Sequence, residues 1–334
     1  MAHNKAWTLA SYPTGWVTEE NFKLLESPVP SPKDGEVLVK NLWLSLDPYM
    51  RGRMSQAKSY ARGVEIGEVI TGETVGEVLE SNHPGFKHGD KVLTGQRMGW
   101  QLYGCMKGEV LTMVDAARAP LSCYLGCLGM PGLTAYFGMK EIGAPKAGET
   151  VVVSAASGAV GSVVGQLAKA WGCRAVGIAG GQAKCDYVVK ELGFDACVDY
   201  KAGNLFRDLK AACPKGVDVS FENVGGEVFD TVLRLMNVFS RIIVCGMISD
   251  YNATKPYELK NIRSVLVNRI RMQGMIVFDW HQRYPEARNE LAGMLQQRKL
   301  KYRESVAEGL ESAPQAFIGL LKGRNFGKQL IKLA

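Results

Sequence analysis

The stretch Thr150-Val151-Val152-Val153-Ser154-Ala155-Ala156-Ser157-Gly158-Ala159-Val160-Gly161 determines which class of fold this chain adopts. Residues 150–154 predict a buried strand, and the apolar residues that follow are spaced as on one helical face, with a stop at Gly172. A tight turn of small residues between strand and helix lets the backbone approach a pyrophosphate, and the helix N-terminus offers N–H groups to its oxygens. We therefore expect a dinucleotide to bind at Gly158, Ala159, Val160 and Gly161, although the same turn can be purely structural.

The same strand–helix alternation continues along the middle of the chain. Further strands are predicted at 174–178, 196–198, 217–221 and 241–245, and a helix is predicted at 182–192. Apolar strands that alternate with helices indicate a parallel sheet with helices on both faces. Residues 126–299 are therefore predicted to form a doubly wound Rossmann domain, and the chain belongs to the α/β class.

The end of the second strand indicates which dinucleotide binds. Proteins that bind NAD place an acidic residue there to hold the ribose 2′-hydroxyl. The corresponding stretch, Gly177-Ile178-Ala179-Gly180-Gly181-Gln182-Ala183-Lys184, contains no acid and ends in a lysine. A carboxylate repels a 2′-phosphate and a lysine attracts it, so NADPH is favoured as the cofactor.

The two ends of the chain have a different pattern of predicted elements from the middle. Residues 1–125 contain short predicted strands at 35–40, 75–79 and 90–93, separated by Gly, Pro and Asn, which is typical of a barrel or sandwich. The last residues contain a predicted helix at 313–321 and a strand at 329–333. We expect residues 300–334 to return to the first domain.

Composition excludes several classes of protein. The 334 residues are 46% hydrophobic and 22% charged, without an apolar run of membrane-spanning length. The net charge of +7 is spread along the chain, which disfavours a nucleic-acid partner. No secretory signal is recognised at the N-terminus, so a cytoplasmic location is expected.

The cysteines and histidines do not predict a metal site. The eight cysteines include no C-x-x-C pair, which fits a reducing compartment. Zinc alcohol dehydrogenases need Cys and His ligands in the first domain, where this chain offers only Cys105, Cys123 and Cys127 and badly placed histidines. Without a Lewis acid to polarise an alcohol or simple ketone, hydride addition to an activated C=C bond is favoured over alcohol oxidation.

Several longer motifs resemble one family over nearly the whole chain. They are Leu44-Ser45-Leu46-Asp47-Pro48-Tyr49-Met50-Arg51-Gly52-Arg53, Gly129-Met130-Pro131-Gly132-Leu133-Thr134-Ala135-Tyr136, Glu222-Asn223-Val224-Gly225-Gly226, Cys245-Gly246-Met247-Ile248-Ser249-Asp250-Tyr251-Asn252 and Lys322-Gly323-Arg324-Asn325-Phe326-Gly327-Lys328. The chain resembles the zinc-independent medium-chain dehydrogenases/reductases, and within them the leukotriene B4 dehydrogenase/prostaglandin reductase and 2-alkenal reductase group. This resemblance implies a GroES-like first domain, a homodimer, and NADPH-dependent reduction of small enones such as curcumin-like enones and 2-alkenals.

The resemblance also implies roles for individual residues. Lys184 and Tyr200 are expected to hold the 2′-phosphate, and Tyr49 and Tyr251 are expected to face the substrate as the catalytic pair. Other residues are expected to border the ribose and the nicotinamide: Asn223, Cys245, Gly246, Met247, Ile248, Ser249, Tyr251, Met275, Ile276, Val277 and Asn325.

Two departures from the family pattern concern the substrate. The segment 252–268 is shorter than in relatives, which leaves the size of the substrate pocket open. A tyrosine that some members carry is replaced here by Val267 and Asn268, so its role cannot be transferred.

The expected reaction is hydride transfer to the β-carbon of an α,β-unsaturated ketone or aldehyde, with stabilisation of the enolate by a preorganised donor, either Tyr251 or the ribose hydroxyl of the cofactor. Core packing is the alternative role for both tyrosines. An NADPH:quinone oxidoreductase is the main alternative function, and a non-catalytic NADPH-binding protein is an alternative of another class.

Overall fold

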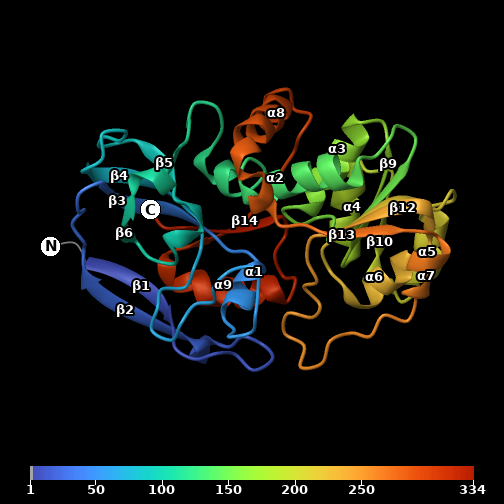
Figure 1. Cartoon of the computed structure of the whole chain (residues 1–334), viewed down its shortest axis with the longest axis horizontal. Helices are drawn as coiled ribbons and strands as arrows, with labels where there is room; N and C mark the ends of the chain where they lie inside the picture. The colour runs from blue at the N-terminus through green and yellow to red at the C-terminus, as the bar shows by residue number, and fades with distance from the viewer. Residues whose placement is uncertain (1–2) are drawn as a thin grey trace. The chain divides into compact units, whose positions relative to one another are not determined.

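The computed structural model describes residues 3–334, which divide into two units. Unit 1 contains the residues up to Leu125 together with Glu304–Ala334, and unit 2 contains Gly126–Arg303. Unit 1 is therefore discontinuous in sequence, and unit 2 is inserted into it. Figure 1 shows the helices and strands of both units.

Unit 2 is built on a six-stranded parallel sheet. The strands lie in the order β10-β9-β8-β11-β12-β13, and each neighbouring pair is parallel. The order reverses between β8 and β11, as in doubly wound nucleotide-binding sheets, whose ligands bind at the carboxyl ends of the strands beside this point. The strands are β8 (Thr150–Ser154), β9 (Arg174–Ala179), β10 (Ala196–Asp199), β11 (Val217–Glu222), β12 (Met236–Val244) and β13 (Arg271–Gly274).

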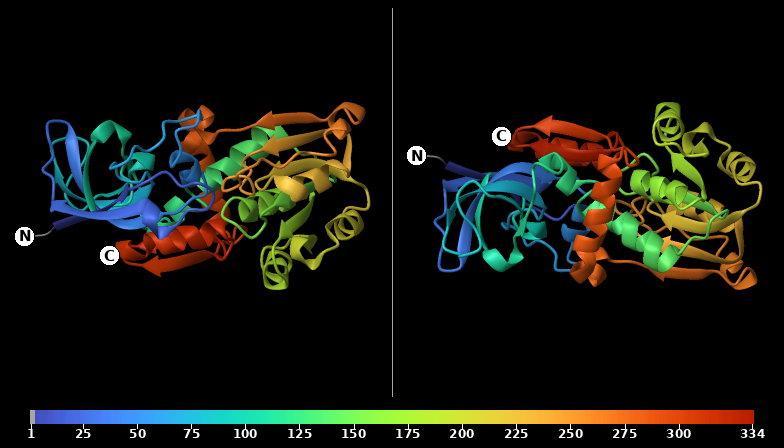
Figure 2. Two further views of the ribbon diagram at one scale, coloured as in Figure 1. Left: turned by 90° about the horizontal axis from the view of Figure 1, so that it is seen from below. Right: turned by 90° about the horizontal axis from the view of Figure 1, so that it is seen from above.

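Helices of unit 2 lie on both sides of these strands (Figure 2). On one side, Leu209, Phe229 and Val232 pack with Val152 and Ile242 of the sheet in one buried cluster. The helices are α2 (Met130–Phe137), α3 (Gly161–Ala170), α4 (Gln182–Lys190), α5 (Leu205–Ala212), α6 (Gly226–Leu233), α7 (Arg263–Val267) and α8 (Tyr284–Gln296).

Unit 1 is built mainly from antiparallel strands. Seven strands form one sheet in the order β14-β15-β3-β4-β5-β7 with β6 paired to β3, and β1 and β2 form a separate antiparallel pair. The strands are β1 (His3–Leu9), β2 (Phe22–Pro28), β3 (Glu36–Ser45), β4 (Thr74–Ser81), β5 (Lys91–Leu93), β6 (Tyr103–Lys107), β7 (Thr112–Met113), β14 (Glu304–Glu308) and β15 (Lys328–Lys332). The last strand, β15, pairs with β3, so the C-terminal segment completes the sheet that the N-terminal segment begins.

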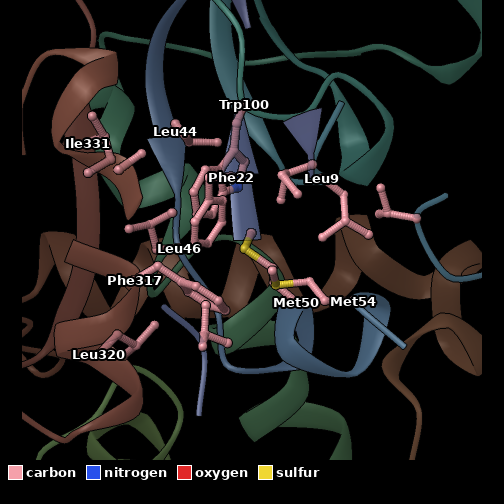
Figure 3. Packing of buried hydrophobic residues seen from close by; sticks show 14 of the residues in the cluster. Leu9, Phe22, Leu44, Leu46, Met50, Met54, Trp100, Phe317, Leu320 and Ile331 are labelled. Atoms are coloured by element: carbon pink, nitrogen blue, oxygen red, sulfur yellow. The ribbon is translucent and has the colours of Figure 1, made fainter. Parts of the chain in front are cut away.

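An aromatic core anchors the part of unit 1 that carries Tyr49. The rings of Phe22 and Trp100 are stacked with centroids 5.5 Å apart, and the ring of Phe317 from α9 (Ala313–Leu321) meets Trp100 edge-on at 5.6 Å. Met50 and Met54 are fully buried in the same core (Figure 3). These two side chains fix the short helix α1 (Tyr49–Arg53) to the core.

The predicted α/β class with a Rossmann-type parallel sheet is confirmed. The observed bounds of β8 and α9 coincide with the predicted ones. The predicted strand 241–245 covers only the second half of β12, which begins at Met236. Residues 236–240 do not alternate buried and exposed positions, since Val238 and Phe239 are both exposed, and Phe239 has a positive φ of 61°, so this part lacks a regular strand pattern.

Candidate functional site: a dinucleotide cradle in unit 2

The glycine turn after β8 has no room for a side chain at Gly161. A Cβ placed on Gly161 would lie 2.3 Å from the carbonyl oxygen of Ala155. The Gly158 N–H donates to the same carbonyl at 2.9 Å, which closes the turn. The first turn of α3 carries no acidic residue, so the positive end of the helix dipole faces this turn without a competing negative charge.

A pair of lysines lies beside the end of β9. Burial lowers the pKa of Lys184, and the positive charge of Lys201 lowers this pKa further. The Tyr200 ring lies against Gly180, since a Cβ on Gly180 would meet that ring at 2.8 Å. Two mutually repelling cations and a phenol at this strand end suit an anion with the charge of a phosphate. Lys201 was not predicted from the sequence.

The Asp199 carboxylate, near this site, is hydrogen-bonded by backbone N–H groups. The carboxylate of Asp199, at the end of β10, accepts hydrogen bonds from the Gly181 N–H at 2.8 Å and the Lys201 N–H at 2.9 Å. These bonds join the glycine turn after β9 to the segment that carries Tyr200 and Lys201. The two segments are therefore held as one structure.

A buried carboxylate organises the carboxyl end of β11. Glu222 is 0% exposed, and its Oε1 accepts from the Ser154 hydroxyl and the Val224 and Gly225 N–H groups at 2.6–2.8 Å. Its Oε2 is buried and has no hydrogen-bond partner among the described residues. Burial raises the pKa of Glu222 to about 7, and the hydrogen bonds to Oε1 oppose this rise.

Asn223 is fixed by the same network. Its N–H donates to the Ser154 hydroxyl at 2.8 Å, and its amide Nδ2 donates to the Ser154 carbonyl at 2.9 Å. The ends of β8 and β11 are therefore tied together next to the glycine turn.

The segment Cys245–Tyr251 folds over the end of β11. The N–H groups of Cys245 and Gly246 donate to the Glu222 carbonyl, and the Ser249 N–H donates to the Val224 carbonyl. A Cβ on Gly246 would lie 3.0 Å from the Tyr251 hydroxyl, so that hydroxyl lies next to the backbone of this segment. Burial raises the pKa of the Cys245 thiol to about 12, with a contribution from Glu222. This thiol stays protonated at neutral pH. Met247, Ile248 and Ser249 complete the segment.

The residues after β13 contribute buried side chains. The Met275 N–H donates to the Val244 carbonyl at 3.1 Å, and the Met275 and Val277 side chains are 5% and 6% exposed. Met275 lies against Gly138, where a Cβ would come within 2.7 Å of its sulfur. Ile276 is half-buried. The structure thus brings the predicted unit 2 residues to the carboxyl ends of β8, β9, β11, β12 and β13.

Two predicted residues lie in unit 1. The Tyr49 hydroxyl is buried without a hydrogen-bond partner among the described residues, and the Arg53 guanidinium lies 5.6 Å from its ring centroid. Burial raises the pKa of Tyr49 well above its usual value, and the negative charge of Asp47 adds to this. The Asn325 amide donates to the Gly327 carbonyl at 2.7 Å, which orders the turn before β15.

The segment that carries Tyr49 depends on a buried ion pair. The ammonium group of Lys328, on β15, contacts Asp47 Oδ1 at 2.5 Å and donates to the Leu46 carbonyl at 2.7 Å. Ser45 donates to the other oxygen of Asp47. Both charged side chains are almost fully buried, at 4% exposed. The C-terminal strand therefore positions the start of α1.

Residues 3–334 contain neither a metal-binding cluster nor a membrane-spanning helix. No group of three or more His, Cys, Asp or Glu side chains in this range is arranged to hold a metal ion. No helix in it has both the length and the apolar character needed to span a bilayer.

A doubly wound parallel sheet with a glycine turn at its switch point, in a chain with a second, β-rich unit, is the architecture of many dinucleotide-dependent oxidoreductases. The protein-family model described as the N-terminal domain of oxidoreductase matches residues 5–114, and the family model described as zinc-binding dehydrogenase matches residues 159–293. The chain belongs to the medium-chain dehydrogenase/reductase family.

Three relatives show how far the similarity extends. The chain is 50% identical to the NADPH-dependent curcumin reductase of Escherichia coli (strain K12), over 99% of this chain and 97% of that protein. It is 44% identical to the NADP(+)-dependent 2-alkenal reductase of Nicotiana tabacum, over 99% and 98%. The crystal structure of CurA from Vibrio vulnificus in complex with NADPH superposes with a TM-score of 0.94 at 48% identity, over 99% of both chains.

Proposed function

We propose that this chain is an NADPH-dependent reductase of the C=C bond of α,β-unsaturated ketones and aldehydes. The observation that carries the proposal is the site at the end of β9, where Lys184 and Lys201 gather positive charge and Asp199 accepts hydrogen bonds from backbone N–H groups. Two cations at this strand end favour a 2′-phosphate, and no acidic residue stands in the stretch 177–184 that would hold a 2′-hydroxyl. The names of the relatives supply the substrate class.

The residues of unit 2 fit this cofactor. The turn at Gly158–Gly161 leaves backbone room for the pyrophosphate, and Tyr200 with the two lysines holds the 2′-phosphate. Asn223, Cys245–Tyr251 and Met275–Val277 are proposed to border the ribose and nicotinamide, and Asn325 is proposed as a further cofactor contact. When bound, NADPH supplies the hydride that adds to the β-carbon of the enone.

Tyr251 is proposed to stabilise the charge that develops on the substrate. Negative charge builds on the carbonyl oxygen as the β-carbon is reduced, and a preorganised donor at that oxygen contributes several kcal/mol. We assign this donor role to the Tyr251 hydroxyl. Tyr49 is proposed to orient the substrate, and its raised pKa keeps its hydroxyl protonated as a donor.

Three further properties belong to this proposal. The enzyme works without zinc, forms a homodimer and is located in the cytoplasm. Metal analysis of the purified chain that finds stoichiometric zinc would contradict the first property. Light scattering and cell fractionation test the other two.

The decisive experiment compares NADPH with NADH on a panel of enones and quinones. Lys184→Ala and Lys201→Ala each remove one charge-assisted contact to the 2′-phosphate, worth about 1.5–3 kcal/mol, so KM for NADPH should rise roughly 10-fold or more. KM for NADH should not change. Lys210→Ala, which removes an exposed charge on α5, is the matched control. Equal effects of the three variants on KM for NADPH would refute the assignment of the phosphate site.

The same panel separates the alternative functions. Faster oxidation of NADPH by quinones than by any enone indicates a quinone oxidoreductase. Bound NADPH that no acceptor oxidises indicates a non-catalytic binding protein. Tyr251→Phe should lower kcat with an enone, because it removes the proposed donor hydroxyl, and Tyr302→Phe is its control. Unchanged turnover in Tyr251→Phe would remove Tyr251 from the mechanism.

A further inference from the structure

Two cysteine thiols meet in unit 2. Cys185 lies in the first turn of α4, Cys197 lies in β10, and their sulfur atoms are 3.1 Å apart. The S–S bond of a disulfide is about 2.05 Å long, so these sulfurs need to approach by only about 1 Å to bond. Both cysteines are free.

The packing around the two thiols favours this contact. Helix α4 packs on β10, and β10 pairs with β9 (Figure 1). On β9, Gly177 lies against the Cys197 sulfur, where a Cβ on the glycine would come within 3.2 Å. The absence of a side chain at Gly177 leaves room for the Cys197 sulfur on this side of the sheet. Cys185 is 4% exposed and Cys197 is partly exposed, so a small oxidant can approach the pair from the Cys197 side.

The two thiols have different acidities. The hydrogen bond from the Cys197 thiol lowers the pKa of Cys185, and a backbone hydrogen bond at Ala179 adds to this, while burial, Asp199 and Asp186 oppose it. The hydrogen bond to Cys185 raises the pKa of Cys197, and burial raises it further. Cys185 is therefore the more acidic of the two thiols. A low-pKa thiol beside a second thiol is the arrangement typical of oxidisable cysteines.

We propose that Cys185 and Cys197 form a dithiol modification site that hydrogen peroxide oxidises to an intramolecular disulfide. The Cys185 sulfur attacks one peroxide oxygen, the O–O bond breaks, and Cys185 becomes a sulfenic acid with release of one water. The Cys197 sulfur then attacks the Cys185 sulfur, the S–O bond breaks, and the departing hydroxide takes the Cys197 proton as a second water. The two thiols lose two electrons and two protons, and one peroxide becomes two waters.

The proposed crosslink joins two parts of the cationic site. Lys184 precedes Cys185, and Asp199 and Tyr200 follow shortly after Cys197. Oxidation therefore ties the first turn of α4 covalently to the end of β10. The proposal rests on the thiol geometry alone, so it does not depend on the proposed reductase activity.

The test maps disulfides in the full-length chain. The reduced protein is exposed to increasing hydrogen peroxide, remaining thiols are alkylated under denaturing conditions, and non-reduced peptides are analysed by mass spectrometry. We expect the eight thiols to fall to six, with one linked pair of peptides that contains Cys185 and Cys197 and that dithiothreitol separates. Recovery of both cysteines as alkylated thiols, or as separate sulfinic acids without a linked peptide, would overturn the proposal.

Matched variants show whether the pair is specific. Cys185→Ser and Cys197→Ser should each keep all seven remaining thiols at the dose that crosslinks the unaltered protein. Cys173→Ser removes a buried thiol that donates to the Lys146 carbonyl, and it should still lose two thiols. Loss of two thiols in Cys185→Ser would contradict the proposal. The mapping of the unaltered chain stands even where a variant folds poorly.

Discussion

Replacement of the buried Glu222 by glutamine should make the stability of this protein depend less on pH. Burial raises the pKa of Glu222 from its ordinary 4.5 to about 7 in the folded chain. Between these two values the unfolded chain releases this proton while the folded chain keeps it. The free energy of unfolding therefore falls as pH rises through this window, and the loss is complete above about pH 7.

The size of the effect follows from the shift. A difference of about 2.5 pKa units corresponds to about 3 kcal/mol. Glutamine has the shape of the protonated acid, and its carbonyl oxygen can accept the same bonds from Ser154, Val224 and Gly225. Glu222→Gln should therefore match the unaltered protein near pH 4.5 and exceed it at pH 8. For a unit of this length, 3 kcal/mol corresponds to a Tm difference of roughly 6–12 °C.

The assay is thermal unfolding of both proteins at pH 4.5 and pH 8, followed by intrinsic fluorescence. Glu227→Gln, which changes an exposed carboxylate on α6, is the control and should show no pH-dependent difference. A Tm difference between Glu222→Gln and the unaltered protein that is the same at both pH values would refute the assignment of a raised pKa to Glu222.

Three other substitutions test the cradle and the segment that carries Tyr49. Gly161→Ala places a Cβ against the Ala155 carbonyl oxygen, so it should cost about 1–3 kcal/mol of stability and weaken NADPH binding. Thermal unfolding measures the first effect and fluorescence titration the second. Unchanged binding would argue against a phosphate at this turn. Lys328→Met leaves the buried Asp47 without its cation and should cost about 3–5 kcal/mol, and Asp47→Asn in the same chain should recover part of the loss in urea unfolding; equal stabilities of the single and double variants would contradict the role of charge. Tyr49→Phe removes a buried hydroxyl that has no hydrogen-bond partner among the described residues. Tm should therefore stay the same or rise by the equivalent of about 1–3 kcal/mol, while turnover of an enone falls. A lower Tm would contradict this account.

The sequence predicted the features that depend on neighbours along the chain. β8 and its glycine turn were predicted because residues 150–161 combine a run of valines with small residues at the required spacing. Helix α9 was predicted from its own apolar pattern. The return of residues 300–334 to the first domain was inferred because their predicted elements resemble those of residues 1–125.

Features that depend on contacts between distant residues were missed. Lys201 follows Lys184 by 17 positions, and the two come together only because β9 and β10 are parallel neighbours. Asp199 looks like a free acid in the sequence, yet Gly181 and Lys201 N–H groups occupy it. The role of Glu222 was also missed, because a single acid at a strand end does not show that its surroundings are apolar.

The pairing of β15 with β3 has a consequence for how the chain is made. During synthesis, β3 leaves the ribosome long before β15, because all of residues 126–303 are translated between unit 1's two segments. At about 5–20 residues per second, this interval is on the order of ten to thirty seconds. Throughout it, residues 43–45 of β3 lack their partner strand, although β6 can already pair with residues 36–40, and Asp47 has no Lys328.

The nascent chain therefore carries an open strand edge and an unpaired acid beside α1 while unit 2 is free to fold. Unit 1 is completed only when residues 328–332 emerge. A truncation that removes this short strand should leave a protein whose first segment aggregates or recruits chaperones during translation, even though unit 2 is complete.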